Sequence, residues 1–161
     1  MANRGSERGS QQMKKPRLLI SAAWLLHLAA WLLPTVTATE YSGRLIGWKA
    51  FRLAACGVWP CKGMEFDAWY HAVLAAVSVL TTVLFILGSP WIVLRGARSL
   101  RKRSAWVAFA AFIFNAHWIV IFGSERFDLT IGYYCWWLSF LVLATGLFYL
   151  SGQDRPEPIQ N

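Results

Sequence analysis

The chain has 161 residues, of which 57% are hydrophobic, 16% aromatic and 15% charged, and its net charge is +8. A water-soluble domain of this length has too little interior to hide so much apolar surface, so the composition indicates an integral membrane protein. The basic excess does not indicate nucleic acid, because the Lys and Arg residues stand in short clusters beside apolar runs, where anionic lipid head groups would meet them.

The two ends of the chain are polar. Residues 1–16 are basic and rich in Gly, Ser and Gln, and residues 152–161 contain Gly, Pro and Gln. Segments of this composition bury too little apolar surface to offset the entropy of ordering them. We therefore predict a disordered tail at each end, with a membrane domain over residues 17–151 between them.

Four apolar segments within this domain have the length of membrane-spanning helices. Crossing ~30 Å of hydrocarbon as a helix takes about 20 residues, and a helix is needed because unpaired backbone groups cannot be left in lipid. The predicted spans cover residues 18–33, 69–94, 105–122 and 131–150 and carry no Lys, Arg, Asp or Glu in their interiors. Pro90 lacks an N–H and predicts a kink near the end of the second span. The predicted fold class is all-α: an integral membrane four-helix bundle.

The distribution of basic residues predicts the orientation of these spans. The two tails and the loop between the second and third spans carry 11 Lys and Arg residues, whereas the other two loops carry 5. Because Lys and Arg near helix ends are retained on the cytoplasmic side, we expect both termini in the cytoplasm.

The first span has a second interpretation. The basic start at residues 14–17, the apolar stretch and the small residues at 36–38 also describe a cleavable signal peptide. Trp24, His27 and Trp31 make the stretch bulkier than a typical signal peptide, which favours a retained helix.

The loop between the first two spans is the longest and faces the outer side. If residues 47–53 are helical, Trp48, Phe51 and Arg52 share one face and suit a short helix lying in the outer membrane interface. The alternative is an ordered loop that rests its aromatic side chains on the bundle.

The same loop contains Cys56 and Cys61, on the side predicted to be oxidising, so a local disulfide is expected. A redox-active pair is disfavoured, because the spacing is not C-x-x-C and only Cys135 remains to pass electrons on. No matched set of Cys and His residues suggests zinc. We predict no catalytic, cofactor-binding or metal-binding residue.

Three polar residues fall at membrane depth: His27 in the first span, and Asn115 and His117 in the third. Polar residues at such depth usually face protein, so interhelical hydrogen bonds are expected. Shared haem ligation by the two histidines is disfavoured, because they would lie about 13 and 18 Å from the inner membrane surface. The aromatic residues at 133, 134, 136 and 137 predict an interfacial belt.

Three stretches together resemble a group of small bacterial four-span membrane proteins. They are Gly47–Phe51, Ser89–Pro90 and Gly132–Ser139, and the likeness covers about residues 18–150. The group usually has Asn-Pro where this chain has Ser89–Pro90, and the cysteine pair is an addition. The resemblance implies a multi-pass protein of the bacterial inner membrane and nothing about its chemistry.

Without a catalytic motif, the sequence favours a non-enzymatic accessory, interaction or immunity-type protein. Its partners would be the lipid bilayer and a membrane protein or a second copy of the chain. One alternative is a small transporter or channel subunit whose path is lined by His27, Asn115 and His117. Another is a membrane redox protein that uses the cysteine pair or the histidines.

Overall fold

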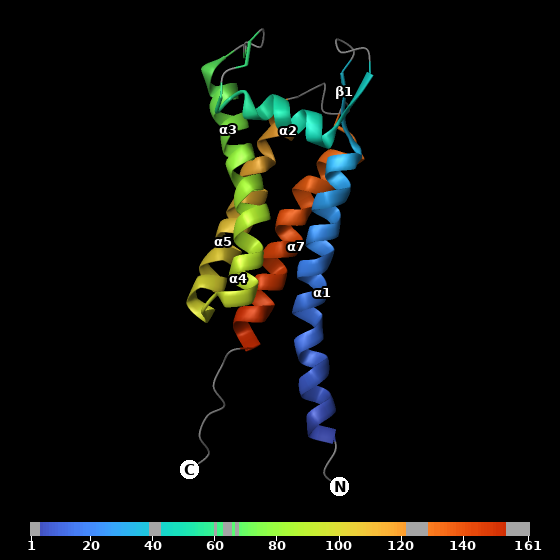
Figure 1. Ribbon diagram of the computed structural model, residues 1–161, viewed down its shortest axis with the longest axis vertical. Helices are drawn as coiled ribbons and strands as arrows, with labels where there is room; N and C mark the ends of the chain where they lie inside the picture. The colour runs from blue at the N-terminus through green and yellow to red at the C-terminus, as the bar shows by residue number, and fades with distance from the viewer. Residues whose placement is uncertain are drawn as a thin grey trace.

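The computed structural model describes residues 4–38, 43–59, 61–62, 66, 68–121 and 129–153. The elements in chain order are α1 (Arg4–Leu32), β1 (Pro34–Ala38), β2 (Gly43–Ile46), α2 (Gly47–Ala55), α3 (Trp69–Val83), the π-helical turn η2 (Leu84–Gly88), α4 (Ser89–Arg95), α5 (Arg98–Asn115), α6 (His117–Ile121) and α7 (Ile131–Gln153). Helices α3, η2 and α4 form one column and α5 and α6 another, and they stand beside α1 and α7 (Figure 1).

The two ends of this bundle differ. At one end, here called the cap end, α2 and the two strands lie across the columns (Figure 1). At the other, called the basic end, α1 begins, α4 passes into α5 and α7 ends (Figure 1). Exposed basic side chains gather at the basic end: Lys15, Arg17, Arg95, Arg98, Lys102 and Arg103.

Among the described residues, three helical segments are long and apolar enough to cross a membrane: Trp69–Arg95, Arg98–Ile121 and Ile131–Gln153. They coincide with the segments predicted at 69–94, 105–122 and 131–150, although the middle one begins earlier, at Arg98. The span predicted at 18–33 falls in α1, which is not among them. Its uncharged part runs only from Leu18 to Leu32, fewer than the about 20 residues of an average span.

Helices α1 and α7 run antiparallel and pack along a seam of small residues (Figure 1). The buried residues of α1 recur at alternating steps of four and three, the spacing of a heptad seam: Pro16, Ile20, Ala23, His27 and Ala30. Gly132, Ser139 and Gly146 recur every seven residues on α7 and are all buried. A Cβ at Gly146 would lie 2.8 Å from Ile20 Cγ1, and one at Gly132 would lie 2.5 Å from the Pro34 carbonyl oxygen. The backbones approach closely because these positions have almost no side chain.

Helix α7 also packs against α5, so it is the central element of the bundle. The α5 side supplies Ala105, Ala108 and Ala111 at three-residue spacing, and α7 supplies Phe140, Leu143 and Leu147 to the same core cluster. Because α7 is covered on two sides, its buried residues do not form a single stripe.

The π-helical turn η2 comes directly before Ser89 and Pro90. Pro90 has no N–H to donate to the carbonyl four residues back, so a regular α-helix cannot continue through it. The irregularity predicted at Pro90 therefore takes the form of a π turn. It positions Phe85 and Ser89 toward α1, where Phe85 stacks on His27 and the Ser89 hydroxyl accepts from Trp24 Nε1 at 3.0 Å.

The structure is mostly helical, as predicted, and adds one element that was not predicted: β1 and β2 form an antiparallel pair in which Thr37 pairs with Arg44. The other edge of β1 meets Leu129, and Thr130 N donates to the Thr35 carbonyl at 2.9 Å. The β-branched run at residues 35–37 is the sequence signal for this strand.

The structure also differs from the prediction at the two ends of the chain. Helix α1 begins at Arg4 and so includes most of residues 1–16, for which a disordered tail is predicted because Gly5, Gly9 and Pro16 are poor helix formers. At the other end α7 continues to Gln153, and the remainder of the predicted tail 152–161 lies outside the described residues.

The seam predicts that Gly132→Ala lowers the free energy of unfolding by about 1–3 kcal/mol, because the new methyl group meets backbone atoms that cannot turn aside. The matched control is Gly152→Ala on the same helix, where a Cβ has nothing within 4 Å. That control should change stability by less than about 0.5 kcal/mol. Denaturant unfolding in detergent, followed by far-UV circular dichroism, measures both, and equal effects would contradict the close approach at Gly132.

Candidate functional site

Asn115 is the centre of a polar cluster between α3, α5–α6 and α7, and its side chain is fully buried. Its Oδ1 accepts from Ser78 Oγ at 2.8 Å. Its Nδ2 donates to Thr81 Oγ1 at 3.1 Å and to the Ala111 carbonyl at 2.8 Å. The Tyr133 hydroxyl donates to the Asn115 carbonyl at 2.7 Å. The side-chain amide therefore bonds to α3 through its oxygen and one N–H, and to its own helix α5 through Ala111.

Indole N–H groups extend the Asn115 cluster. Trp118 Nε1 donates to Ser78 Oγ at 3.1 Å, and Trp136 Nε1 donates to Thr82 Oγ1 at 3.0 Å. Beside them, Trp137 Nε1 donates to the Phe112 carbonyl at 2.7 Å and its ring stacks on Phe112. Each of these bonds joins two helices, so the cluster ties three columns together.

This arrangement corrects the interfacial belt predicted for residues 133, 134, 136 and 137. Tyr133 is buried and Trp136 and Trp137 are half-buried, and all three donate to other helices. Of the four, Tyr134 is the residue whose side chain is exposed. The role of the other three differs from the predicted one because a buried indole N–H or phenol O–H needs an acceptor, which a neighbouring helix supplies here.

His27 forms a second polar contact, on the α1 side of α7, and is 1% exposed. Its Nδ1 lies 2.9 Å from Ser139 Oγ, and Ser139 Oγ donates to the Trp136 carbonyl at 2.6 Å. Because the serine proton is used there, His27 Nδ1–H is the donor and Nε2 carries the lone pair. Nε2 is buried without a hydrogen-bond partner, with Phe85 stacked on the ring at 4.1 Å.

His117 lies apart from both contacts. Its Nδ1 donates to the Phe114 carbonyl of its own column at 2.7 Å, and its side chain is half-buried. His27, Asn115 and His117 therefore have separate partners, and the contacts of the described residues join no two of them. The described residues also contain no group of three or more His, Cys, Asp or Glu side chains placed to hold a metal ion.

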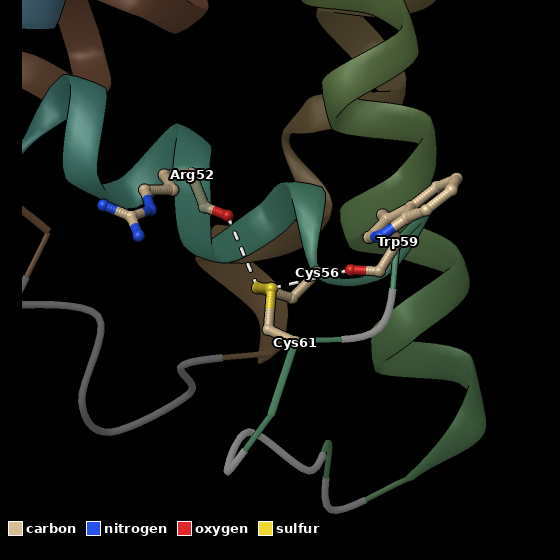
Figure 2. Close-up of a disulfide and its surroundings, with 4 residues drawn as sticks. All are labelled: Arg52, Cys56, Trp59 and Cys61. Atoms are coloured by element: carbon tan, nitrogen blue, oxygen red, sulfur yellow. Dashed lines mark hydrogen bonds between the residues drawn. A yellow bond between two sulfur atoms is a disulfide. The ribbon is translucent and has the colours of Figure 1, made fainter.

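A disulfide joins Cys56 and Cys61 at the cap end and closes a short loop after α2, with the two Cα atoms 5.2 Å apart. Gly57 rests on α3, where a Cβ would lie 2.5 Å from the Ala72 carbonyl oxygen. The sulfurs of Cys56 and Cys61 each lie 3.5 Å from a carbonyl oxygen, and these are van der Waals contacts because a disulfide sulfur has no proton to donate. Figure 2 shows the Trp59 indole pointing away from the disulfide.

Exposed aromatic, apolar and basic side chains stand along α2 and this loop at the cap end. Trp59 is 81% exposed and Val58 59%, and Trp48 is 40% exposed with Lys49 Nζ 5.9 Å from its ring centroid. Arg52 is exposed and points away from the sulfurs (Figure 2). We call Trp48, Lys49, Arg52, Val58 and Trp59 the cap surface.

The cap surface differs from the face predicted for α2. Phe51 is half-buried and stacks on Trp31 with the ring centroids 5.1 Å apart, so it does not share the outward face of Trp48 and Arg52. The end of α1 supplies this aromatic partner, which helical spacing within α2 does not reveal. Val58 and Trp59 are not among the residues that the sequence predicts for this surface. The signal that could have found them is their place in a short loop between two cysteines, where large apolar side chains are hard to bury.

Comparisons with protein-family models, with curated proteins and with solved structures found no match for this chain. The candidate sites are therefore the groups of residues that the structure brings together. They fall into the interior Asn115 cluster, the His27–Ser139 contact and the cap surface.

We expect Asn115→Leu to destabilise the fold by about 1–3 kcal/mol, because it leaves the buried Ser78 hydroxyl without its acceptor and removes the donor to the Thr81 hydroxyl. Thr145→Val is the control, since Thr145 Oγ1 donates only within its own helix, to the Leu141 carbonyl. Unfolding in mixed micelles of mild detergent and sodium dodecyl sulfate measures both variants. Equal losses would show that the Asn115 cluster does not hold the helices together.

The His27–Ser139 contact predicts non-additive effects. Ser139→Ala leaves both nitrogens of His27 buried without a partner, whereas adding His27→Phe removes those polar atoms and keeps a ring against Phe85. The double variant should be at least about 0.5 kcal/mol more stable than the sum of the two single changes implies. The same unfolding assay measures the coupling, and strict additivity would contradict the contact.

Proposed function

We propose that the protein is a four-span, non-enzymatic protein of the bacterial inner membrane that binds another protein through its cap surface. The fourth span in this proposal is α1. Its face away from the seam exposes Leu18, Leu25, Leu28 and Leu32 by 54–78%, a stripe that favours lipid over water. Lys15 and Arg17 can extend along the helix to the lipid head groups, which lengthens the part that fits the bilayer.

The same contacts support retention of α1 over cleavage as a signal peptide. Cleavage after residue 38 would remove the contact of Ile20 with Gly146 and that of His27 with Ser139. It would expose one side of α7. It would also remove β1 from its pairing with β2.

The proposed orientation places the basic end in the cytoplasm and the cap end outside. The 11 to 5 distribution of Lys and Arg supports it, as does a disulfide at the cap end, because disulfides persist in oxidising compartments. The bacterial inner membrane is supported by the resemblance of Gly47–Phe51, Ser89–Pro90 and Gly132–Ser139 to small bacterial four-span proteins.

The observation that carries the interaction function is Trp59, 81% exposed on a loop held by a disulfide. Trp and Arg are the residues that most often dominate binding at protein interfaces, and the cap surface presents two Trp and one Arg. Closing so short a loop removes about 2 kcal/mol of chain entropy from the unfolded state, so the binding groups are ordered before a partner arrives. A partner with an acidic and apolar surface would be complementary.

The interior supports this proposal over a transport path. The polar side chains of the Asn115 cluster bond to one another, so they are not left to line a water-filled route. The alternative of a redox protein has no second cysteine pair in the sequence to exchange electrons with Cys56 and Cys61.

The proposal predicts that Trp59→Ala combined with Arg52→Gln lowers recovery of the partner by roughly tenfold or more, because interface Trp and Arg side chains are common hot spots. The matched control is Trp91→Ala with Arg103→Gln, which changes an exposed Trp and an exposed Arg on α4 and α5. Quantitative mass spectrometry after extraction in mild detergent measures recovery. A monomer with no specific partner under every condition, or equal losses in both variants, would contradict the proposal.

A further inference from the structure

A cavity opens between α1 and α7 near the basic end, separate from both interior polar contacts. Its volume is about 770 Å³, within the range of about 300–1,000 Å³ for ligand pockets. It is lined by Lys15 and Pro16 of α1 and by residues of α7 that include Thr145, Phe148, Tyr149 and Gly152. Figure 1 shows the two helices diverging toward this end.

The cavity exists because the small-residue seam ends before the helices do. At Gly146 a Cβ would already lie 2.8 Å from Ile20 Cγ1, whereas a Cβ at Gly152 would have nothing within 4 Å. Beyond Gly146 the described side chains of α1 and α7 therefore leave open a space that an external group can fill.

The lining contains aromatic rings and one cationic side chain. Phe148 and Tyr149 form the apolar wall, and Lys15 supplies the ammonium group. Arg98 Nε donates to the Ser151 carbonyl at 3.0 Å, so its guanidinium offsets the partial negative charge at the end of α7. Among the side chains described at this end no carboxylate is present, and those of Glu7 and Asp154 lie outside the described ones. A group that fits is an amphiphile with a negatively charged head.

The cavity also lies where both helices change from apolar to polar sequence. The uncharged part of α1 begins at Leu18, just after Lys15, and that of α7 passes at Leu150 into Ser151, Gly152 and Gln153. If the protein spans the membrane as proposed, this level is that of the lipid phosphates in the inner leaflet.

We propose that the cavity binds an anionic phospholipid of the inner leaflet, with its phosphodiester at Lys15 and an acyl chain along Phe148 and Tyr149. The proposal rests on the membrane placement given above. Basic pockets between membrane helices on the cytoplasmic side are suited to anionic head groups, because the charges attract while the apolar wall accepts the chain. The bound lipid completes the α1–α7 seam where the side chains of the protein leave it open.

Native mass spectrometry of the full chain tests the proposal, after extraction in mild detergent and removal of lipid. Phosphatidylglycerol is titrated in, and phosphatidylcholine with the same acyl chains is titrated in parallel. We expect one phosphatidylglycerol to bind more tightly than phosphatidylcholine, and Lys15→Gln to weaken it about fivefold. Gly152→Trp should abolish that first binding event by filling the cavity.

The controls are Lys102→Gln, an exposed lysine on α5, and Gly152→Ala, which adds one methyl group in open space. Both should bind phosphatidylglycerol like the unaltered chain. Equal binding of the two lipids, or equal losses from Lys15→Gln and Lys102→Gln, would overturn the proposal. Displacement of the lipid by inorganic phosphate would do so too, because it would indicate a free phosphate site. If Gly152→Trp does not fold, the two lysine variants decide.

No partner protein takes part in this experiment, so its failure leaves binding at the cap surface untouched. Recovery of the chain in the soluble fraction after cell breakage would instead refute the membrane placement on which both proposals rest.

Discussion

The close approach of α1 and α7 is the constraint on which the other contacts depend. Gly146 lies against Ile20 of α1, Gly132 lies against the backbone of Leu33 and Pro34 directly after α1, and Ser139, midway between the two glycines, receives the hydrogen bond of His27. Apolar side chains that face lipid gain little from burial against each other, so in the proposed membrane the association of helices relies on such close packing and on interhelical hydrogen bonds. If α1 moved outward, His27 would lose Ser139, Ile20 would lose Gly146, and β1 would move away from α7.

Interhelical hydrogen bonds also hold the other side of α7, around Asn115. Asn115, Ser78 and Tyr133 come from three different columns, and each bond among them crosses a helix boundary. A buried polar group costs free energy unless it is paired, so these residues specify which helices are neighbours and in what register. The interior polar groups therefore have a structural role. The surfaces proposed to bind other molecules lie at the two ends of the bundle.

The two ends have different surfaces and different proposed partners. The cap end presents Trp59 and Arg52 on a short helix and a disulfide-closed loop, which suits a protein surface. The basic end presents Lys15 over an apolar wall, which suits a lipid with a charged head. Charge distribution links them, since the excess of Lys and Arg on which the proposed orientation rests includes Lys15, which lines the cavity.

The sequence by itself determined the helical segments at 69–94, 105–122 and 131–150, because the length and apolarity of a spanning helix are local properties of the chain. It also identified Cys56 and Cys61 as a pair, from spacing and compartment alone. Only the tertiary structure decided the partners of Asn115 and His27, the inward position of Phe51, the β-hairpin and the use of Trp136 and Trp137 as interhelical donors. Periodicity gives the face on which a residue lies but not the element that covers that face, because the covering element comes from a distant part of the chain and is selected by packing.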